Sequence, residues 1–364
     1  MQQQLYIGLM SGTSLDGVDA VLVDLSQSSP QLLASHFLAF DAALRADLMA
    51  LHTPRDNELH ISQVIANQLA RLYAVTIPPL LEHCRFNPQQ IIAIGCHGQT
   101  IRHCPEHGYT LQIGNASLLA ELTGISVVSD FRSRDIAAGG QGAPLVPAFH
   151  NQVLRHPDVH RVILNIGGIS NVTNLSPTVP TSGFDCGPGN LLMDAWCERH
   201  LGTPYDKDGA WAATGKILPQ LLALMLAEPY FALPPPKSSG RDLFNMDWLH
   251  SKLNGAERAQ DVQATLLELS CVSIAQSIEQ HCAGAREIYL CGGGAHNQTL
   301  RNRLSALLPN CVIAVTDSLG VQGDYLEAIA FAWLAQQTIL GKPSNLPLVT
   351  GAAHACVLGA IHHA

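Results

Sequence analysis

A strand, a turn of glycine and small hydroxyl residues, and a second strand occur twice in this chain of 364 residues. The first copy runs from Leu5 to Leu25 around the turn 11–14, and the second runs from Arg161 to Leu175 around the turn 165–171. Branched apolar residues before the turn and alternation after it are typical of paired strands. Glycine lets the backbone approach a ligand closely, and oriented N–H groups can surround phosphate oxygens. Each copy is therefore predicted to be a hairpin that faces phosphate.

The elements after each hairpin are also duplicated. A helix is predicted over 60–83 and then a strand over Ile91–Ile94; in the second half a helix over 261–281 precedes a strand over Glu287–Leu290. The same order of elements in both halves predicts two similar α/β domains that face a cleft.

Composition agrees with two α/β domains. A chain of 364 residues is longer than one hydrophobic core usually serves, and 47% hydrophobic against 13% charged residues suits strands buried on both faces. The formal charge of −9 argues against nucleic acid as a partner, because binding to a phosphate backbone rests on clusters of lysine and arginine.

The chain shows no signal-like segment and no apolar run of membrane-spanning length, so we expect a cytoplasmic protein without a membrane partner. Its ten cysteines include no Cys-x-x-Cys pair, and several lie in apolar patterns, as Cys271 and Cys291 do. Most are predicted to be reduced thiols in the core.

The boundary between the domains is predicted near 130–142, where the apolar pattern gives way to charged residues and glycines. We expect an N-terminal domain over 1–132 and a C-terminal domain over 133–344, with 345–364 packing back on the first. A ligand is expected to be held at this crossing.

Asp185 is the strongest catalytic candidate. It ends the apolar approach of the segment 184–190 and precedes glycines that open a helical pattern. A carboxylate there can take a proton from a nucleophile during phosphoryl transfer, which otherwise needs mainly positioning and charge stabilisation. Alternatively, Asp185 only caps the following turn.

A pair of aspartates and a run of glycines each allow two interpretations. Asp16 and Asp19, beside the first turn, either hold the waters of a magnesium ion or stabilise the hairpin. The run Gly292–Gly294, after a buried strand, either lets adenosine lie against bare backbone or forms a plain turn.

Four segments taken together resemble the anhydro-N-acetylmuramic acid kinase family: LMSGTSLDGVD at 9–19, CHGQT at 96–100, NIGGISN at 165–171 and FDCGPGN at 184–190. The resemblance covers essentially the whole chain, and the joint order of the motifs is specific. This family belongs to the superfamily of acetate and sugar kinases, heat-shock ATPases and actin. The resemblance thus implies an α/β fold of two duplicated actin-like (ribonuclease H-like) domains facing a cleft for ATP and substrate.

The resemblance also implies a reaction. Such enzymes open the internal ether bridge of 1,6-anhydro-N-acetylmuramic acid with water and phosphorylate O6 from ATP, giving N-acetylmuramic acid 6-phosphate and ADP in cell-wall recycling. Asp185 would deprotonate the water that attacks C1. ATP and Mg²⁺ are the implied cofactors, the amino sugar is the small-molecule partner, and a homodimer is the implied assembly.

By the same resemblance, site residues are expected at positions that match the family. The catalytic residues would be Asp185 and Glu327, and Asp16 and Asp185 are candidate Mg²⁺ ligands. The nucleotide would contact Ser11, Gly12, Thr13, Ser14, Leu15, Asp16, Gly17, Val18, Asn165, Gly167, Gly168, Gly187, Gly292, Gly293, Gly294 and Asn297. The sugar would contact His97, Asp130, Arg132, Arg134, Gly139, Gly140 and Gln141.

Two of these residues keep an alternative. Arg134 either binds the lactyl carboxylate of the sugar bidentately or forms a surface salt bridge. Glu327 either reaches the anhydro ring or is an ordinary acidic residue at a helix N-terminus.

Two positions depart from the expected patterns. Superfamily members commonly carry an aspartate just before the first Gly-Thr turn, where this chain has Met10 and Ser11, so magnesium is left to Asp16, Asp185 or water. Cys186 stands where the family commonly has threonine. Two other functions stay open: a sugar kinase of the superfamily that consumes no water, and an ATP-gated binding module.

Overall fold

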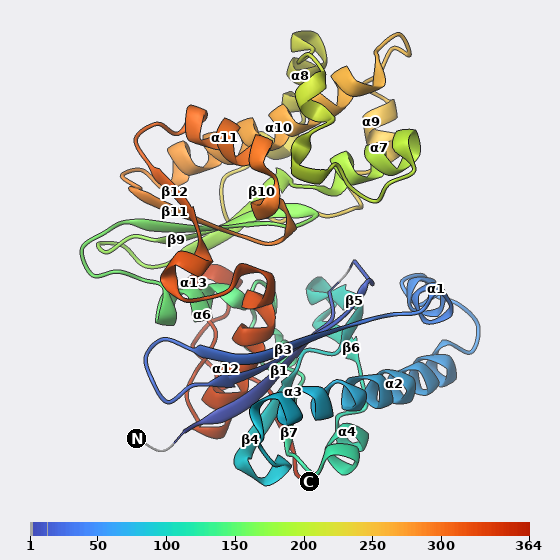
Figure 1. The fold of residues 1–364 in the computed structure, drawn as a ribbon, viewed down its shortest axis with the longest axis vertical. Coiled ribbons are helices and arrows are strands. Elements are labelled where there is room, and N and C mark those ends of the chain that lie inside the picture. The colour runs from blue at the N-terminus through green and yellow to red at the C-terminus, as the bar shows by residue number, and fades with distance from the viewer. Residues whose placement is uncertain (1–2, 13) are drawn as a thin grey trace. The chain divides into compact units, whose positions relative to one another are not determined.

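The computed structural model describes residues 3–12 and 14–364 and divides into two compact units. Unit 1 consists of Met1–Val153 and Gly320–Ala364, and unit 2 is Leu154–Leu319 (Figure 1). The units differ from the predicted domains, because residues 133–153 and 320–344 belong to unit 1. Helices from both of these segments pack on each other or on the sheet of unit 1.

The sheet of unit 1 has the order β13-β7-β4-β1-β2-β3. The first three strands form an antiparallel meander, β4 is parallel to β1, β7 is parallel to β4, and β13 is antiparallel to β7. A separate antiparallel ribbon pairs β5 with β6. The strands are β1 (Leu5–Met10), β2 (Gly17–Asp24), β3 (Gln31–Ala39), β4 (Ile91–Cys96), β5 (Gln99–Cys104), β6 (Tyr109–Ile113), β7 (Val127–Ser129) and β13 (Ala360–His362).

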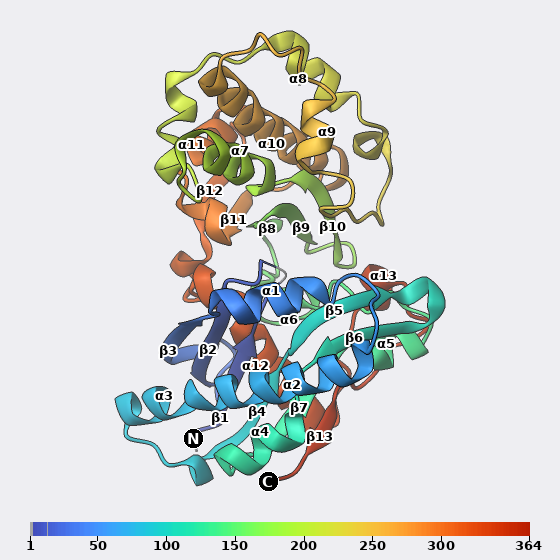
Figure 2. The ribbon, with the colours of Figure 1, turned by 90° about the vertical axis from the view of Figure 1, so that its right-hand side faces the viewer.

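Helices cover both faces of this sheet (Figure 2). Alternate residues Leu5, Ile7 and Leu9 of β1 join the core beneath helices α1 to α4, whereas Gly8 lies under α12. The helices are α1 (Ala42–Ala50), α2 (Glu58–Val75), α3 (Ile77–Cys84), α4 (Ala116–Thr123), α5 (Ser133–Ala137), α6 (Val146–Val153), α12 (Leu326–Ile339) and α13 (Pro347–Thr350).

The single helix predicted over 60–83 is two helices, α2 and α3. Pro78 and Pro79 lie in the first turn of α3, where proline is accepted because the first N–H groups of a helix have no partner within it. In the interior of a continuous helix they would have removed hydrogen bonds, so the chain restarts at Ile77.

Unit 2 repeats the arrangement with the sheet order β10-β9-β8-β11-β12. Its long helix α10 is almost wholly buried, with apolar residues of the sheet, of α7 and of α11 in the same core. The elements are β8 (Arg161–Ile166), β9 (Ile169–Leu175), β10 (Ser182–Pro188), β11 (Glu287–Cys291), β12 (Val312–Val315), α7 (Leu191–Leu201), α8 (Pro219–Leu226), α9 (Met246–His250), α10 (Ala259–His281) and α11 (Gln298–Leu307).

Both sheets thus contain three antiparallel strands in a meander, followed by parallel strands on the side of the first strand. The predicted duplication and the α/β fold of the two units are confirmed. Each predicted hairpin is extended by a third strand, β3 in unit 1 and β10 in unit 2.

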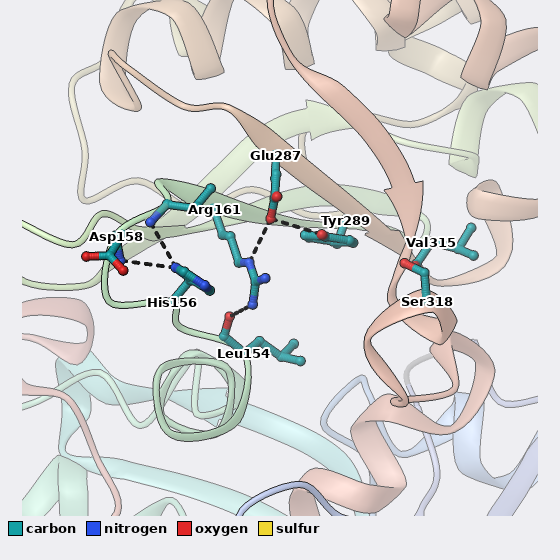
Figure 3. Close-up of polar contacts among 9 residues, drawn as sticks. Leu154, His156, Asp158, Arg161, Glu287, Tyr289, Val315 and Ser318 are labelled. Carbon is teal, nitrogen blue, oxygen red and sulfur yellow. Dashed lines mark hydrogen bonds and ion pairs between the residues drawn. The ribbon is translucent and has the colours of Figure 1, made fainter.

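A polar cluster fixes the first residue of unit 2. Arg161 donates from Nε to Glu287 Oε2 at 2.8 Å and from Nη1 to the Leu154 carbonyl at 3.0 Å (Figure 3). The Tyr289 hydroxyl donates to the same Glu287 oxygen at 2.9 Å, and the guanidinium lies 5.4 Å from the Tyr289 ring centroid. The chain therefore enters unit 2 at a well-anchored residue.

None of the helices in the described part of the chain combines the length and the apolar character that a bilayer crossing requires.

Replacing Gly8 with alanine is expected to destabilise unit 1. A Cβ at Gly8 would lie 1.9 Å from the Ala328 carbonyl oxygen of α12, so the helix would have to move off the sheet. We expect Gly8→Ala to cost at least about 2 kcal/mol, measured as a lower midpoint of urea unfolding. Gly124→Ala is the control: its Cβ would meet open space, and only the left-handed backbone, at about 1 kcal/mol, opposes it. Equal losses in the two variants would show that α12 does not need this contact.

Candidate active site

The first glycine turn of unit 1 joins β1 to β2. The Ser11 hydroxyl is buried and donates to the Gly98 carbonyl at 3.1 Å. The Tyr73 hydroxyl lies 2.8 Å from the Ser11 hydroxyl and donates to it, since the Ser11 proton is already engaged. The Ser11 side chain therefore makes its hydrogen bonds within unit 1. Thr13, a predicted nucleotide contact, lies outside the described residues.

The carbonyl oxygens of this turn are held by the segment after β4. His97 Nδ1 lies 3.3 Å from the Ser11 carbonyl, and Gln99 Nε2 donates to the Gly12 carbonyl at 3.1 Å. No described residue accepts a hydrogen bond from the Gly12 N–H. The carbonyl groups of Ser11 and Gly12 are thus bound within the unit, whereas the Gly12 N–H has no backbone acceptor among the described residues.

His97 and Arg132, both predicted sugar contacts, bind each other. Arg132 donates from Nη2 to His97 Nε2 at 2.9 Å and from Nη1 to the Gly142 carbonyl at 2.8 Å. Burial and the neighbouring guanidinium lower the pKa of His97 to about 3, so its ring is neutral and donates from Nδ1 to Ser11. The pair links the glycine turn to the segment that contains Gly142.

Acidic side chains gather beside the same turn. Burial, Asp16, Glu327 and Asp324 together raise the pKa of Asp19 to about 6. Asp16 is exposed and accepts a hydrogen bond from the Ser14 hydroxyl. Burial raises the pKa of Glu327, in the first turn of α12, and Arg132 opposes the rise.

Three predicted nucleotide contacts lie in the interior of unit 1. The side chains of Leu15 and Val18 are fully buried in its core. Gly17 begins β2, where a Cβ would lie 2.5 Å from the Leu38 carbonyl of β3. Their positions are explained by packing.

The predicted sugar segment lies around α5. Asp130 is exposed and has a left-handed backbone (φ 56°), which is uncommon for a residue other than glycine. Arg134 is exposed on α5, and Gly139 and Gln141 are exposed beyond it. Gly140 is buried, and a side chain does not fit there, since a Cβ would lie 2.2 Å from Asp135 Oδ2.

Asp135 organises this segment and was missed in the sequence. Its carboxylate is fully buried and accepts from the Gly142 N–H at 2.8 Å, and from Asn345 Nδ2 and the Thr350 hydroxyl at 2.7 Å each. The Gly140 N–H donates to its backbone carbonyl at 2.9 Å. A charge inside the protein must be satisfied by donors, and here the donors fix the loop 139–142. The only sequence signal was one more acidic residue in a charged, glycine-rich segment.

The second glycine turn joins β8 to β9 in unit 2. The N–H of Asn190 donates to the Gly167 carbonyl at 2.8 Å, and those of Gly189 and Leu191 donate to the Gly168 carbonyl at 2.9 and 3.1 Å. No described residue accepts from the N–H of Gly167 or Gly168. Gly189, not singled out in the sequence, must be glycine because a Cβ would lie 2.3 Å from the Gly167 carbonyl.

The glycine run after β11 packs against this turn. A Cβ at Gly292 would lie 2.3 Å from Asn165 Oδ1, and one at Gly294 would lie 2.3 Å from Ile166 Cγ2, whereas Gly293 is exposed. The structure thus brings the predicted Asn165, 167–168 and 292–294 together. Asn297 has a structural task, because its side-chain oxygen caps α11 by accepting from the Leu300 N–H at 3.0 Å.

Asp185 lies in β10 at a β-bulge, since Asp185 pairs with Asn171 and Gly187 pairs with Ser170. One carboxylate oxygen accepts from the Ser239 N–H at 2.9 Å. Burial raises the pKa of Asp185 to about 6, against the opposing effects of this hydrogen bond and of Lys237. Bulges commonly re-aim a side chain beside an active site.

The two residues after Asp185 face the interior. Cys186 is fully buried in the hydrophobic core of unit 2. Gly187 is buried, and a Cβ there would lie 2.6 Å from the Phe231 ring. Packing therefore explains Gly187, a predicted nucleotide contact.

In residues 3–12 and 14–364, no group of three or more His, Cys, Asp or Glu side chains is placed to hold a metal ion. A magnesium ion bound through one or two carboxylates and substrate phosphates does not need such a group.

Comparison with known proteins identifies the family. The model described as anhydro-N-acetylmuramic acid kinase matches residues 4–364. An anhydro-N-acetylmuramic acid kinase of Nitrosospira multiformis is 57% identical over 366 residues, covering 100% of both chains, and that of Nitrosomonas europaea is 56% identical over 361 residues, covering 99% of both. The chain belongs to the anhydro-N-acetylmuramic acid kinase family. As a member of this kinase family it is an enzyme that uses ATP, since kinases transfer the γ-phosphoryl group of ATP.

Asp135→Asn is expected to loosen the loop 139–142. The amide keeps one oxygen, which can still accept from Asn345 and Thr350, but its N–H₂ group would then face the Gly142 N–H, and this lost hydrogen bond would cost about 1–3 kcal/mol. We expect faster amide hydrogen exchange at Gly142 and a lower urea midpoint. Asp130→Asn is the matched control, because that aspartate is exposed. Unchanged exchange at Gly142 in Asp135→Asn would contradict this role.

Proposed function

We propose that this chain opens the 1,6-anhydro bridge of 1,6-anhydro-N-acetylmuramic acid with water and phosphorylates O6 from ATP in peptidoglycan recycling. Asp185 takes a proton from the water that attacks C1, and the C1–O6 bond breaks. O6 then accepts the γ-phosphoryl group, which leaves N-acetylmuramic acid 6-phosphate and ADP. The full-length match to kinases named for this sugar supports the substrate.

The observation that carries the mechanism is the environment of Asp185. Its carboxylate is partly withdrawn from water at the bulge of β10, which brings its pKa to about 6. A general base works best when its pKa lies near the working pH, because it is then ionised and still takes protons effectively. A solvated aspartate would be a much weaker base.

The glycine turns are assigned to ATP. The N–H groups of Gly12, Gly167 and Gly168, whose carbonyl groups are held inside their own units, would bind phosphate oxygens, and in unit 1 the Ser14 hydroxyl follows Gly12 closely in the same turn. The exposed Gly293 would lie against adenosine. Glycines at these places leave the backbone accessible to the nucleotide.

The sugar is assigned to the segment around α5 and to Glu327. The exposed guanidinium of Arg134 can bind the lactyl carboxylate bidentately, whereas both terminal nitrogens of Arg132 are used by His97 and Gly142. His97 and Arg132 would then act by holding the loop that the sugar contacts.

Magnesium is assigned to Asp16 and Asp19. Burial is the main cause of the raised pKa of Asp19, and the neighbouring carboxylates of Asp16, Glu327 and Asp324 add to it; a divalent cation would relieve the repulsion among these groups, and carboxylate oxygens suit magnesium. Asp185 has the cationic Lys237 nearby, which disfavours a metal ion there. When bound, magnesium would neutralise charge on the transferred phosphoryl group. A cytoplasmic homodimer completes the proposal.

Asp185→Asn is expected to keep ATP binding and to lower turnover by about 100-fold or more, the usual contribution of a general base. Turnover of the unchanged protein should fall as the pH drops through about 6, because the carboxylate must be ionised to accept a proton. Steady-state rates from pH 5 to 9 and isothermal titration with ATP test both. Asp158→Asn, at an exposed aspartate of the same unit, is the control. Near-normal turnover in Asp185→Asn would exclude this base.

The water and the sugar are tested together. ADP formation should depend on 1,6-anhydro-N-acetylmuramic acid, and in ¹⁸O-labelled water the label should appear at C1 of the product. A sugar kinase that phosphorylates an existing hydroxyl would leave C1 unlabelled. ADP formation that ignores the sugar would point to an ATP-gated binding module.

A further inference from the structure

The loop 229–240, which contains the run Pro234–Pro236, is attached to Asp185 by three hydrogen bonds. The Asp185 N–H donates to the Lys237 carbonyl at 3.1 Å, and the Tyr230 hydroxyl donates to the Asp185 carbonyl at 2.8 Å. The Ser239 N–H donates to the carboxylate at 2.9 Å. One loop therefore holds both backbone groups and the side chain of the same residue.

The Lys237 side chain is itself held in place. Its ammonium lies 4.9 Å from the centroid of the Tyr230 ring and donates to the carbonyl groups of Tyr230 and Phe231 at 3.5 and 3.4 Å. Such contacts stabilise a cation on an aromatic face and restrict its position. These contacts hold the Lys237 side chain on the loop that binds Asp185, and its charge lowers the pKa of the Asp185 carboxyl.

The other titratable groups that act on Asp185 or Lys237 do not supply a competing charge at neutral pH. Tyr230 and Cys186 are neutral because burial raises the pKa of each. Burial and the charge of Lys237 lower the pKa of His281, so this histidine is neutral as well. The Ser239 N–H and the charge of Lys237 oppose the effect of burial on the pKa of Asp185.

We infer that Lys237 is a positioning residue for Asp185, which keeps the carboxylate ionised and, through its loop, fixed in orientation. The inference rests on the proposed role of Asp185 as the base. Without Lys237, burial would act with less opposition, and the carboxylate would hold its proton to higher pH.

Lys237→Met tests this role, with Lys237→Gln as a second neutral variant and Lys237→Arg as the charge-retaining one. Rates are measured from pH 5 to 9, and the Asp185 carboxyl is titrated by ¹³C NMR, its signal assigned by its loss in Asp185→Asn. In both neutral variants we expect the midpoint of the fall in rate at low pH, and the midpoint of the Asp185 carboxyl titration, to move up by about one pH unit. The rates of the two neutral variants should recover at high pH. Lys237→Arg should keep the low-pH midpoint of the unchanged protein.

Lys252→Met is the matched control. Lys252 lies in the same unit, with its ammonium 5.5 Å from the Trp248 ring centroid, and is not among the charges that act on Asp185. An unmoved carboxyl titration in the neutral variants, or an equal loss of rate at every pH, would overturn the inference. Failure of the proposed function would differ: Asp185→Asn would keep its turnover, while the titration would still respond to Lys237.

Discussion

The carbonyl oxygens of both glycine turns are satisfied inside their own units, and the candidate site depends on this constraint. A turn that binds an anion must present N–H groups, so its carbonyl groups need partners elsewhere. In unit 1 the side chains of His97 and Gln99 provide these partners, whereas in unit 2 the backbone of 189–191 does so. The two halves reach the same result with different atoms.

This constraint explains why glycines cluster beyond the turns themselves. The backbone of 189–191 can bind the turn at 167–168 only because Gly189 has no side chain. Gly292 likewise leaves room for the Asn165 side chain. A glycine motif in such a chain can therefore reflect close packing between segments as well as access for a ligand. Gly187, which is buried, is an example of packing.

The hairpins, the helix α10 and the duplicated order were predictable, because apolar periodicity and turn residues act over a few positions. The unit boundary was not, since it depends on contacts such as that of Asp135 with Asn345, 210 residues later. Asp135 and Lys237 lay within segments that the sequence marked only as a glycine-rich crossing and a proline-rich loop. Asn345 and Thr350, which also bind the Asp135 carboxylate, and Asp185, whose N–H donates to the Lys237 carbonyl, are remote in sequence, so no local pattern could show these contacts.

The proposed chemistry of Asp185 depends on its degree of burial. Asp185 lies at the bulge of β10 and is only partly buried, whereas the next residue, Cys186, is fully buried in the core. Complete burial without a cation would leave the carboxyl protonated at neutral pH, and full exposure would return its pKa to that of a weak base. Partial burial opposed by the Ser239 N–H and by Lys237 lies between these limits and gives a pKa of about 6, at which a carboxylate is ionised at neutral pH and can still accept a proton from water.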